Sequence, residues 1–164
     1  MASGQTLLVF TPQAGVPPAS NFATLAARNN HTIWQFDAAA NEILDFEGVL
    51  PRNYNGGGLT VTLIWSAATA TSGVTRWLGS WERHQEDTTD TDSNSFATAQ
   101  AVNATAPGTS GTRAYDTIAF TDGAQIDNLA VGESFRFRVE RDATDAADTM
   151  TGDAELARIE IRET

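Results

Sequence analysis

Hydrophobic and polar residues alternate along much of this chain, which is the pattern of a β-strand with one buried face. Residues 59–65 place an aliphatic side chain or Trp65 at every second position, with threonines between them. Residues 134–141 repeat the pattern with phenylalanine and valine on one face and arginine and glutamate on the other. Both segments are predicted to be strands, with Trp65 and Phe137 buried.

Other segments are rich in β-branched and aromatic residues and are bounded by glycine, proline or polar clusters. They predict seven further strands, at residues 6–10, 32–36, 42–50, 74–83, 96–102, 112–121 and 154–162. In the last strand Leu156 and Ile159 are three positions apart, so strict alternation would place them on opposite faces. Keeping both on the core side predicts a β-bulge near Ala157 or Arg158. Helical periodicity is weak, with one or two turns predicted at residues 23–28 and 142–150.

Eight or nine short strands at close spacing predict an all-β fold, an antiparallel two-sheet sandwich of jelly-roll type with little helix. The 164 residues are 41% hydrophobic, enough for one domain that needs no metal or disulfide for stability. We expect this β domain to occupy residues 21–164.

Residues 1–20 differ from the rest because they hold three of the five prolines. Proline donates no hydrogen bond, so the stretch is predicted to be either an N-terminal arm or a first strand followed by a Pro-rich connection. Apolar side chains on a terminus are favourable only when they are buried somewhere. If the stretch is an arm, these side chains contact a partner, and the candidate residues are Leu8, Phe10, Pro12, Val16, Pro17 and Pro18.

Charge narrows the possible partners. The formal net charge is −11, and all ten basic residues are arginine. A chain of this sign is repelled by nucleic acids and by anionic membrane surfaces, so neither is expected as a partner. Residues 1–10 carry no basic residue before their apolar stretch, and we expect no secretory signal.

Candidate chemistry is sparse. There is no cysteine, no G-x-S-x-G motif and no phosphate-binding loop, and the two histidines lie in polar segments. Asp87, Asp90 and Asp92 are calcium candidates, but their loop lacks the glycine and terminal glutamate of an EF-hand and is better read as Asx turns. No cofactor and no catalytic residue is therefore predicted, and we do not expect an enzyme.

Four aromatic residues raise the question of a carbohydrate platform. Trp77 and Trp81 share one strand face, and Trp34 and Tyr54 lie near turns. Such a platform requires exposed rings, whereas aromatic residues of β-sandwiches are mostly core. The buried position is the one we expect for all four.

Two segments resemble a known group of proteins. Residues 46–73, with their Asn-Tyr-Asn-Gly-Gly-Gly turn, and residues 141–156 are similar to small β proteins encoded among the structural genes of tailed bacteriophages and prophages. The resemblance covers residues 32–164 and involves turns and strand faces. It implies a jelly roll, often trimeric, of the kind that decorates capsids, and it implies no catalytic residue.

From the resemblance we expect a non-enzymatic virion structural protein, a capsid decoration (cement) protein that bridges capsomers. It would be a homotrimer on the capsid surface, made in the host cytoplasm, with the major capsid protein as partner. Two alternatives stay open: the receptor-binding head domain of a tail fibre or spike, and a carbohydrate-binding module.

Overall fold

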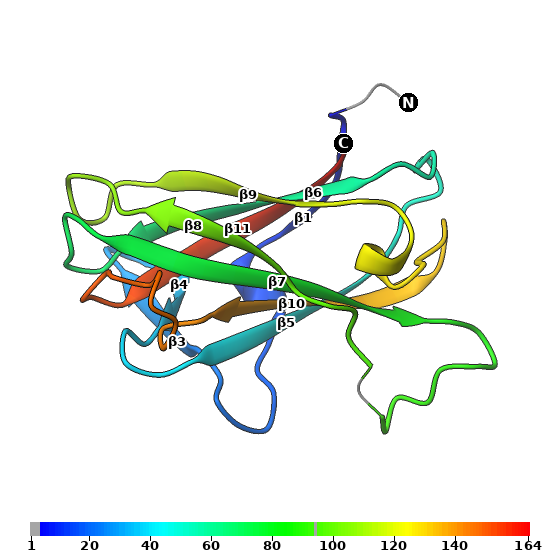
Figure 1. Ribbon diagram of the computed structural model, residues 1–164, viewed down its shortest axis with the longest axis horizontal. Helices are drawn as coiled ribbons and strands as arrows, with labels where there is room; N and C mark the ends of the chain where they lie inside the picture. The colour runs from blue at the N-terminus through cyan, green and yellow to red at the C-terminus, as the bar shows by residue number, and fades with distance from the viewer. Residues whose placement is uncertain (1–3, 94) are drawn as a thin grey trace.

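The computed structural model describes residues 4–93 and 95–164 and has the form of two β-sheets packed face to face (Figure 1). Within these residues the elements are, in chain order, β1 (Thr6–Phe10), η1 (Pro12–Ala14), β2 (Gly15–Val16), β3 (Thr24–Arg28), β4 (His31–Phe36), β5 (Glu42–Val49), β6 (Leu59–Ala67), β7 (Val74–His84), β8 (Gln100–Thr105), β9 (Ala114–Phe120), η2 (Ala124–Ile126), β10 (Ser134–Arg141) and β11 (Ala154–Glu163).

Six strands form one sheet, in the order β3-β4-β11-β6-β9, with β1 also paired to β11. The other five form the second sheet, in the order β2-β5-β10-β7-β8. Every pairing between these strands is antiparallel. The predicted fold class, an all-β sandwich of jelly-roll type, is confirmed.

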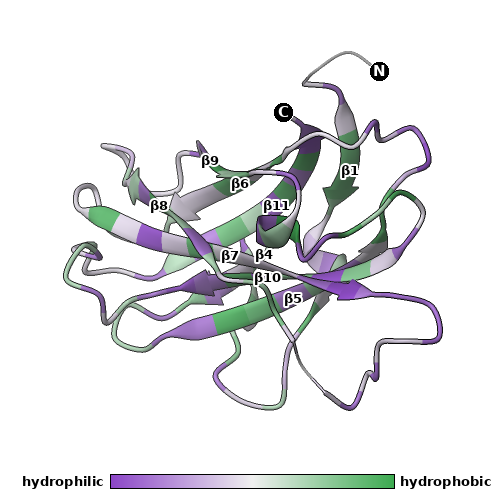
Figure 2. Cartoon of the chain, turned by 45° about the vertical axis from the view of Figure 1, so that its right-hand side comes forward, coloured by the Kyte–Doolittle hydropathy of each residue, from purple (hydrophilic) through white to green (hydrophobic). Residues whose placement is uncertain are grey.

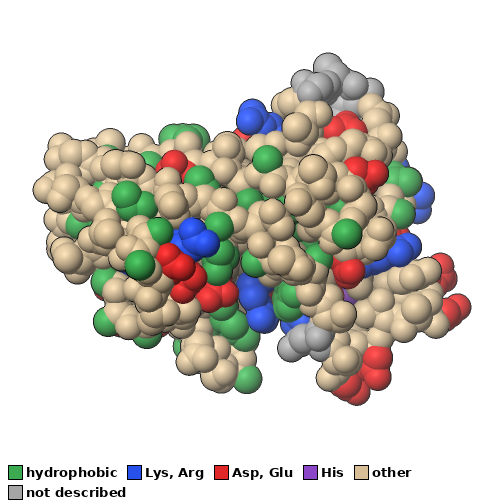
Figure 3. Space-filling model, in the orientation of Figure 1, with side chains coloured by type: hydrophobic (Ala, Val, Ile, Leu, Met, Phe, Trp, Pro, Cys, Tyr) green, Lys and Arg blue, Asp and Glu red, His purple; other side chains and the backbone are tan. Residues whose placement is uncertain are grey.

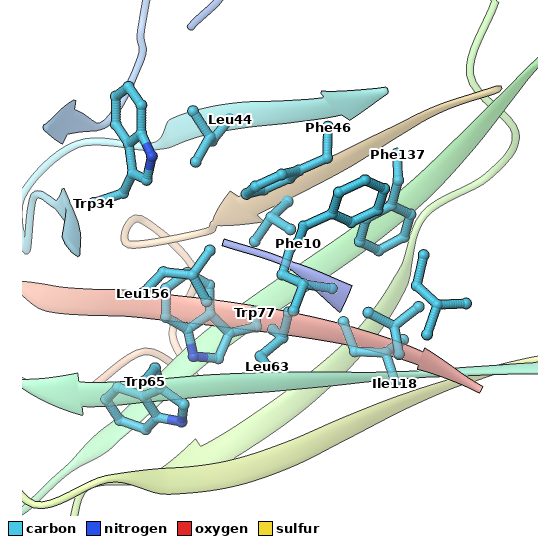
Figure 4. Packing of buried hydrophobic residues seen from close by; sticks show 14 of the residues in the cluster. Phe10, Trp34, Leu44, Phe46, Leu63, Trp65, Trp77, Ile118, Phe137 and Leu156 are labelled. Carbon is cyan, nitrogen blue, oxygen red and sulfur yellow. The ribbon is translucent and has the colours of Figure 1, made fainter. Parts of the chain in front are cut away.

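The core lies between the sheets and is made by the alternating positions. Trp65 and Phe137 are fully buried, as predicted. Trp65 packs edge-on against Trp77 of the opposite sheet, with ring centroids 5.9 Å apart. Figure 4 shows these side chains pointing into the space between the sheets, and Figure 2 shows polar and apolar bands succeeding each other along the strands.

The predicted bulge in the last strand is also confirmed. Leu156 of β11 pairs with Trp65 of β6, and the next paired residues are Arg158 and Ile64, so Ala157 is an extra residue. The insertion returns Ile159 to the inner face.

The N-terminal segment belongs to the sandwich. β1 pairs with β11, and Phe10 is only 8% exposed, with its ring 5.5 Å from that of Phe46. Trp34 Nε1 donates a hydrogen bond to the Pro12 carbonyl at 2.7 Å, and β2 pairs with β5. From Gly4 onward the stretch is therefore a first strand followed by a Pro-rich connection, rather than an arm.

Both predicted helical segments are wrong. Residues 24–28 form β3, an edge strand that pairs with β4 through a two-residue turn at Asn29 and Asn30. Both asparagines have positive φ, 45° and 65°, which is the turn geometry that matches strand twist. Pairing with β4 thus overrides the helix propensity of the alanines.

No helix in the described part of the chain is long and apolar enough to cross a bilayer.

The segment after β10 forms turns, where a helix was predicted. Asp148 accepts two hydrogen bonds from Arg141, at 3.0 and 2.9 Å, and both side chains are buried. The strand predicted at residues 96–102 is β8, displaced to later residues. The preceding stretch runs along β7, where the Ala97 amide donates to the Trp81 carbonyl at 2.8 Å.

Candidate functional site

A groove on the outer face of the six-stranded sheet brings together three arginines, two of which form no ion pair among the described residues. It consists of two adjoining depressions of about 370 and 240 Å³ that share His31, Arg113 and Arg158. One is completed by Arg28, Asn29 and Gly111, and the other by Thr11, Pro12, Gln13, Asn30, Thr32 and Ala157. The larger falls within the size range of ligand pockets.

Two connections bring distant residues to this groove. The β3–β4 hairpin supplies Arg28 and His31 as a cross-strand pair. The loop between β8 and β9, at the same end of the sandwich (Figure 1), supplies Gly111 and Arg113. Gly111 has φ +78°, and a Cβ there would lie 2.7 Å from the Arg28 guanidinium. Glycine is therefore needed for this close approach.

The β-bulge of β11 supplies the third arginine. In a regular strand without the bulge at Ala157, strict alternation from the buried Leu156 would turn Arg158 inward. With it, Arg158 is exposed and pairs with Ile64. Bulges of this kind commonly redirect a side chain at a functional position.

One buried carboxylate balances part of this charge. Arg28 donates to Glu155 at 3.0 Å and to the Ala68 carbonyl at 2.8 Å, and Glu155 is 6% exposed. Ser66 Oγ donates to the same carboxylate at 3.1 Å and accepts from Arg113 Nη1 at 3.2 Å. Arg28 and Glu155 thus neutralise each other beneath the groove.

Arg113 and Arg158 have no carboxylate within ion-pair distance among the described residues. Burial lowers the pKa of Arg113, and the charges of Arg158 and Arg28 lower it further, against the opposing effect of Glu155. The groove therefore carries a local excess of positive charge on a chain whose net charge is −11.

An exposed aromatic ring lies beside this charge. Tyr115 of β9 is 67% exposed and pairs with Ile64 of β6, which in turn pairs with Arg158 of β11. Directly paired residues point to the same side of a sheet. Tyr115 and Arg158 therefore share the outer face, two strand spacings or about 10 Å apart.

The outer face of the five-stranded sheet is also charged, but its charges are paired. Arg138 donates to both carboxylate oxygens of Asp45 at 2.8 and 2.9 Å, and Arg136 Nε donates to Glu82 at 2.7 Å. The centre of the Phe96 ring lies 4.2 Å from the Arg138 guanidinium and 4.9 Å from that of Arg136. Figure 3 shows basic and acidic side chains next to each other on this face.

The aromatic residues considered for a platform are core residues, as expected. Trp77 and Trp81 are fully buried, and Trp34 and Tyr54 are each 6% exposed. Burial, reinforced by nearby carboxylates, also raises the pKa of Tyr54 to about 12. None of the four offers a free ring face to a ligand.

The calcium candidates Asp87, Asp90 and Asp92 are exposed on the loop between β7 and β8. Asp90 accepts a hydrogen bond from the Asp92 amide at 2.9 Å, as an Asx turn requires. No group of three acidic or histidine side chains in the described residues could hold a metal ion.

The candidate partner-contact residues divide into two sets. Phe10 and Pro12 are buried in the chain's own sandwich, which leaves their side chains little surface for a partner. Leu8 is half-buried against the core. Val16 and Pro17 are exposed and Pro18 is half-buried, and contact of these residues with a partner stays a prediction.

The groove residues were not identified from the sequence, because 85 positions separate Arg28 from Arg113 and a further 45 separate Arg113 from Arg158. One feature of the sequence pointed to the site. The break in alternation near Arg158 predicts a bulge, and a bulge there turns this arginine outward.

Comparison with known proteins supports the fold. No protein-family model and no curated protein matches this chain. It is similar to the CBM22-1 xylan-binding domain of Paenibacillus barcinonensis Xyn10C, with a TM-score of 0.52 and 12% identity over 99% of this chain and 97% of that domain.

Parts of two enzymes are also similar. One is an arabinose-bound α-L-arabinofuranosidase, MgGH51, with a TM-score of 0.53, 11% identity and coverage of 91% of this chain and 23% of that chain. The other is a cycloisomaltooligosaccharide glucanotransferase from Paenibacillus sp., with a TM-score of 0.50, 10% identity and coverage of 92% and 17%. At such identities these likenesses establish the β-sandwich fold alone.

Proposed function

We propose that this chain is a non-catalytic saccharide-binding module whose site is the groove at Arg28, Arg113 and Arg158, with the Tyr115 ring beside it. The observation that carries the proposal is the single exposed tyrosine ring on the same sheet face as unpaired guanidinium groups. A sugar ring has an apolar face that packs on an aromatic ring and hydroxyls that accept hydrogen bonds from arginine.

The lining of the groove supports binding without catalysis. Glycoside hydrolysis uses two carboxyl groups on either side of the scissile bond. No described residue that lines the groove is an aspartate or glutamate. The nearby Glu155 is buried and bonded to Arg28 and Ser66, so it is not available as a general acid or base.

The fold likeness agrees with this proposal, because the xylan-binding domain matches this chain over almost the full length of both. The shared fold does not fix the ligand site. The choice of groove therefore depends on the side chains described above.

Affinity electrophoresis and calorimetric titration against a panel of soluble plant and bacterial polysaccharides test the proposal. We expect binding, with Tyr115→Ala weakening it by about tenfold, which corresponds to ~1.4 kcal/mol. Phe22→Ala is the matched control, because Phe22 is the other exposed aromatic ring, at 46%, and lies outside the groove. No binding to any saccharide, or equal losses in the two variants, would contradict the proposal.

A second candidate, capsid decoration, is favoured by a different observation. Val16, Phe22 and Leu25, which lie on or beside the edge strands β2 and β3, are 46–54% exposed. Exposed apolar groups at a sheet edge suit assembly with further copies or with a capsid protein. Light scattering that gives a trimer, abolished by Leu25→Glu, would support this candidate, and a monomer at all concentrations would count against it.

A further inference from the structure

We propose that the groove selects saccharides that carry isolated anionic groups, uronate carboxylates or sulfate esters, through Arg113 and Arg158. This inference rests on the proposed function and specifies its ligand class. It follows from where positive charge is left unpaired, from the donors still free in the groove, and from the overall charge of the chain.

The other arginines show how unusual the groove is. Six of the ten arginines form ion pairs: Arg28, Arg76, Arg83, Arg136, Arg138 and Arg141. Among the described residues Arg52, Arg113, Arg158 and Arg162 form none, and of these four Arg113 and Arg158 line the same depression. On a chain with 21 acidic residues, two neighbouring guanidiniums without a carboxylate partner are a site that an external anion completes.

Free hydrogen-bond donors point the same way. A guanidinium has five N–H donors. Arg113 uses one on the Ser66 hydroxyl, and the side chain of Arg158 makes no hydrogen bond to a described residue. Arginine presents its donors as a planar fork that matches the paired oxygens of a carboxylate or sulfate. Asn29, Asn30 and His31 on the rim can bond to the hydroxyls of the same sugar.

The electrostatic environment supports an anion at this place. Burial and the neighbouring guanidiniums both disfavour the charged form of Arg113. A bound anion favours the charged form of Arg113, because its negative charge lies next to guanidiniums that have no other counter-ion on the surface. The charge of Glu155 opposes the lowering of the pKa of Arg113. Its carboxylate lies below the surface, bonded to Arg28 and Ser66, so the open side of the groove holds no anion of the chain's own among the described residues.

The net charge of −11 limits how charged the ligand is. A densely charged polyanion is repelled by the chain as a whole, whereas a single anionic group on a mostly neutral saccharide meets mainly the local field of the groove. Tyr115, about 10 Å from Arg158, then packs against a neighbouring sugar of the same ligand. The preferred ligand is therefore a neutral oligosaccharide with a sparse anionic substituent.

Calorimetric titration with three matched probes tests the inference: a neutral xylo-oligosaccharide, the same oligosaccharide with one uronate, and the same with one sulfate. We expect an anionic probe to bind about tenfold more tightly than the neutral one, with an advantage that shrinks as salt increases. The carboxylate and sulfate arms identify which group is preferred.

Arg158→Gln is expected to abolish this advantage, so that the neutral and anionic probes bind the variant with equal affinity. Arg162→Gln, on the same face of the same strand but outside the groove, is the control and is expected to keep it. If neutral and anionic probes bind equally, and binding still depends on Tyr115, the inference fails while the proposed function stands. If no probe and no other saccharide binds, both fail.

Discussion

Replacing the buried Arg141 by methionine should lower the free energy of unfolding by about 3–5 kcal/mol. The guanidinium donates to both carboxylate oxygens of Asp148, at 3.0 and 2.9 Å. It also donates to the carbonyls of Phe36, Met150 and Gly152, at 3.3, 2.8 and 2.8 Å. Methionine fills a similar volume but donates nothing, so the Asp148 carboxylate keeps only the hydrogen bond from the Arg76 amide, at 3.0 Å, and three carbonyls lose a donor.

The magnitude comes from those losses. An unsatisfied buried polar group costs ~1–3 kcal/mol, and an uncompensated buried charge costs more. Water that enters the loop after β10 can bond to some of these groups and so reduces the loss of stability. The net loss is then the value typical of a broken buried ion pair, ~3–5 kcal/mol.

Urea unfolding followed by tryptophan fluorescence measures the effect. With a slope of ~2 kcal/mol/M, a loss of ~4 kcal/mol lowers the midpoint by ~2 M. Arg76→Gln is the control, because its pairs with Asp142 and Asp145 are longer, 3.7 and 3.5 Å, and partly exposed. The control should lose under ~1 kcal/mol. A similarly small loss in Arg141→Met would refute the reasoning.

Three further predictions follow from the fold. Deleting residues 1–10 should lower the free energy of unfolding by more than ~3 kcal/mol, because it removes β1 and the buried Phe10. An unchanged melting temperature would instead indicate a dispensable arm. Phe137→Ala should cost ~3–5 kcal/mol in the same urea assay, and a loss below ~1 kcal/mol would mean that the side chain is not core. Hydrogen bonds from Arg83 hold the pKa of Glu133 below its ordinary value of 4.5. The ion pair therefore stabilises the fold above pH 4.5, and this stability is lost as the pH falls through the lowered pKa of Glu133. Glu133→Gln should flatten this part of the acid unfolding profile. An unchanged profile would mean that the Arg83–Glu133 pair does not contribute to stability.

Period-two alternation predicted the long strands, because one face of each strand is buried. The burial of Trp65 and Phe137 and the bulge at Ala157 followed from the same pattern. Alternation could not identify β3, because an edge strand with exposed alanines has little pattern to read. The Asn29-Asn30 pair was the missed signal, since two residues with positive φ close a tight hairpin.

The candidate site was harder to predict, because it depends on distance in space rather than on spacing in sequence. Arg28, Arg113 and Arg158 meet only after the β3–β4 hairpin, the loop before β9 and the bulge have formed. The acidic residues between β10 and β11 are largely paired, because most of their carboxylates accept from Arg76, Arg141 and nearby amides. Composition reveals the number of charges but not which of them are paired.

Amide chemical-shift mapping during titration with a uronate-bearing xylo-oligosaccharide tests whether saccharide binds in the groove of Arg113 and Arg158, beside Tyr115. We expect the largest shifts on residues 28–31, 111–115 and 157–158. Shifts concentrated on the outer face of β5 and β10, or on residues 85–99 between β7 and β8, would contradict it.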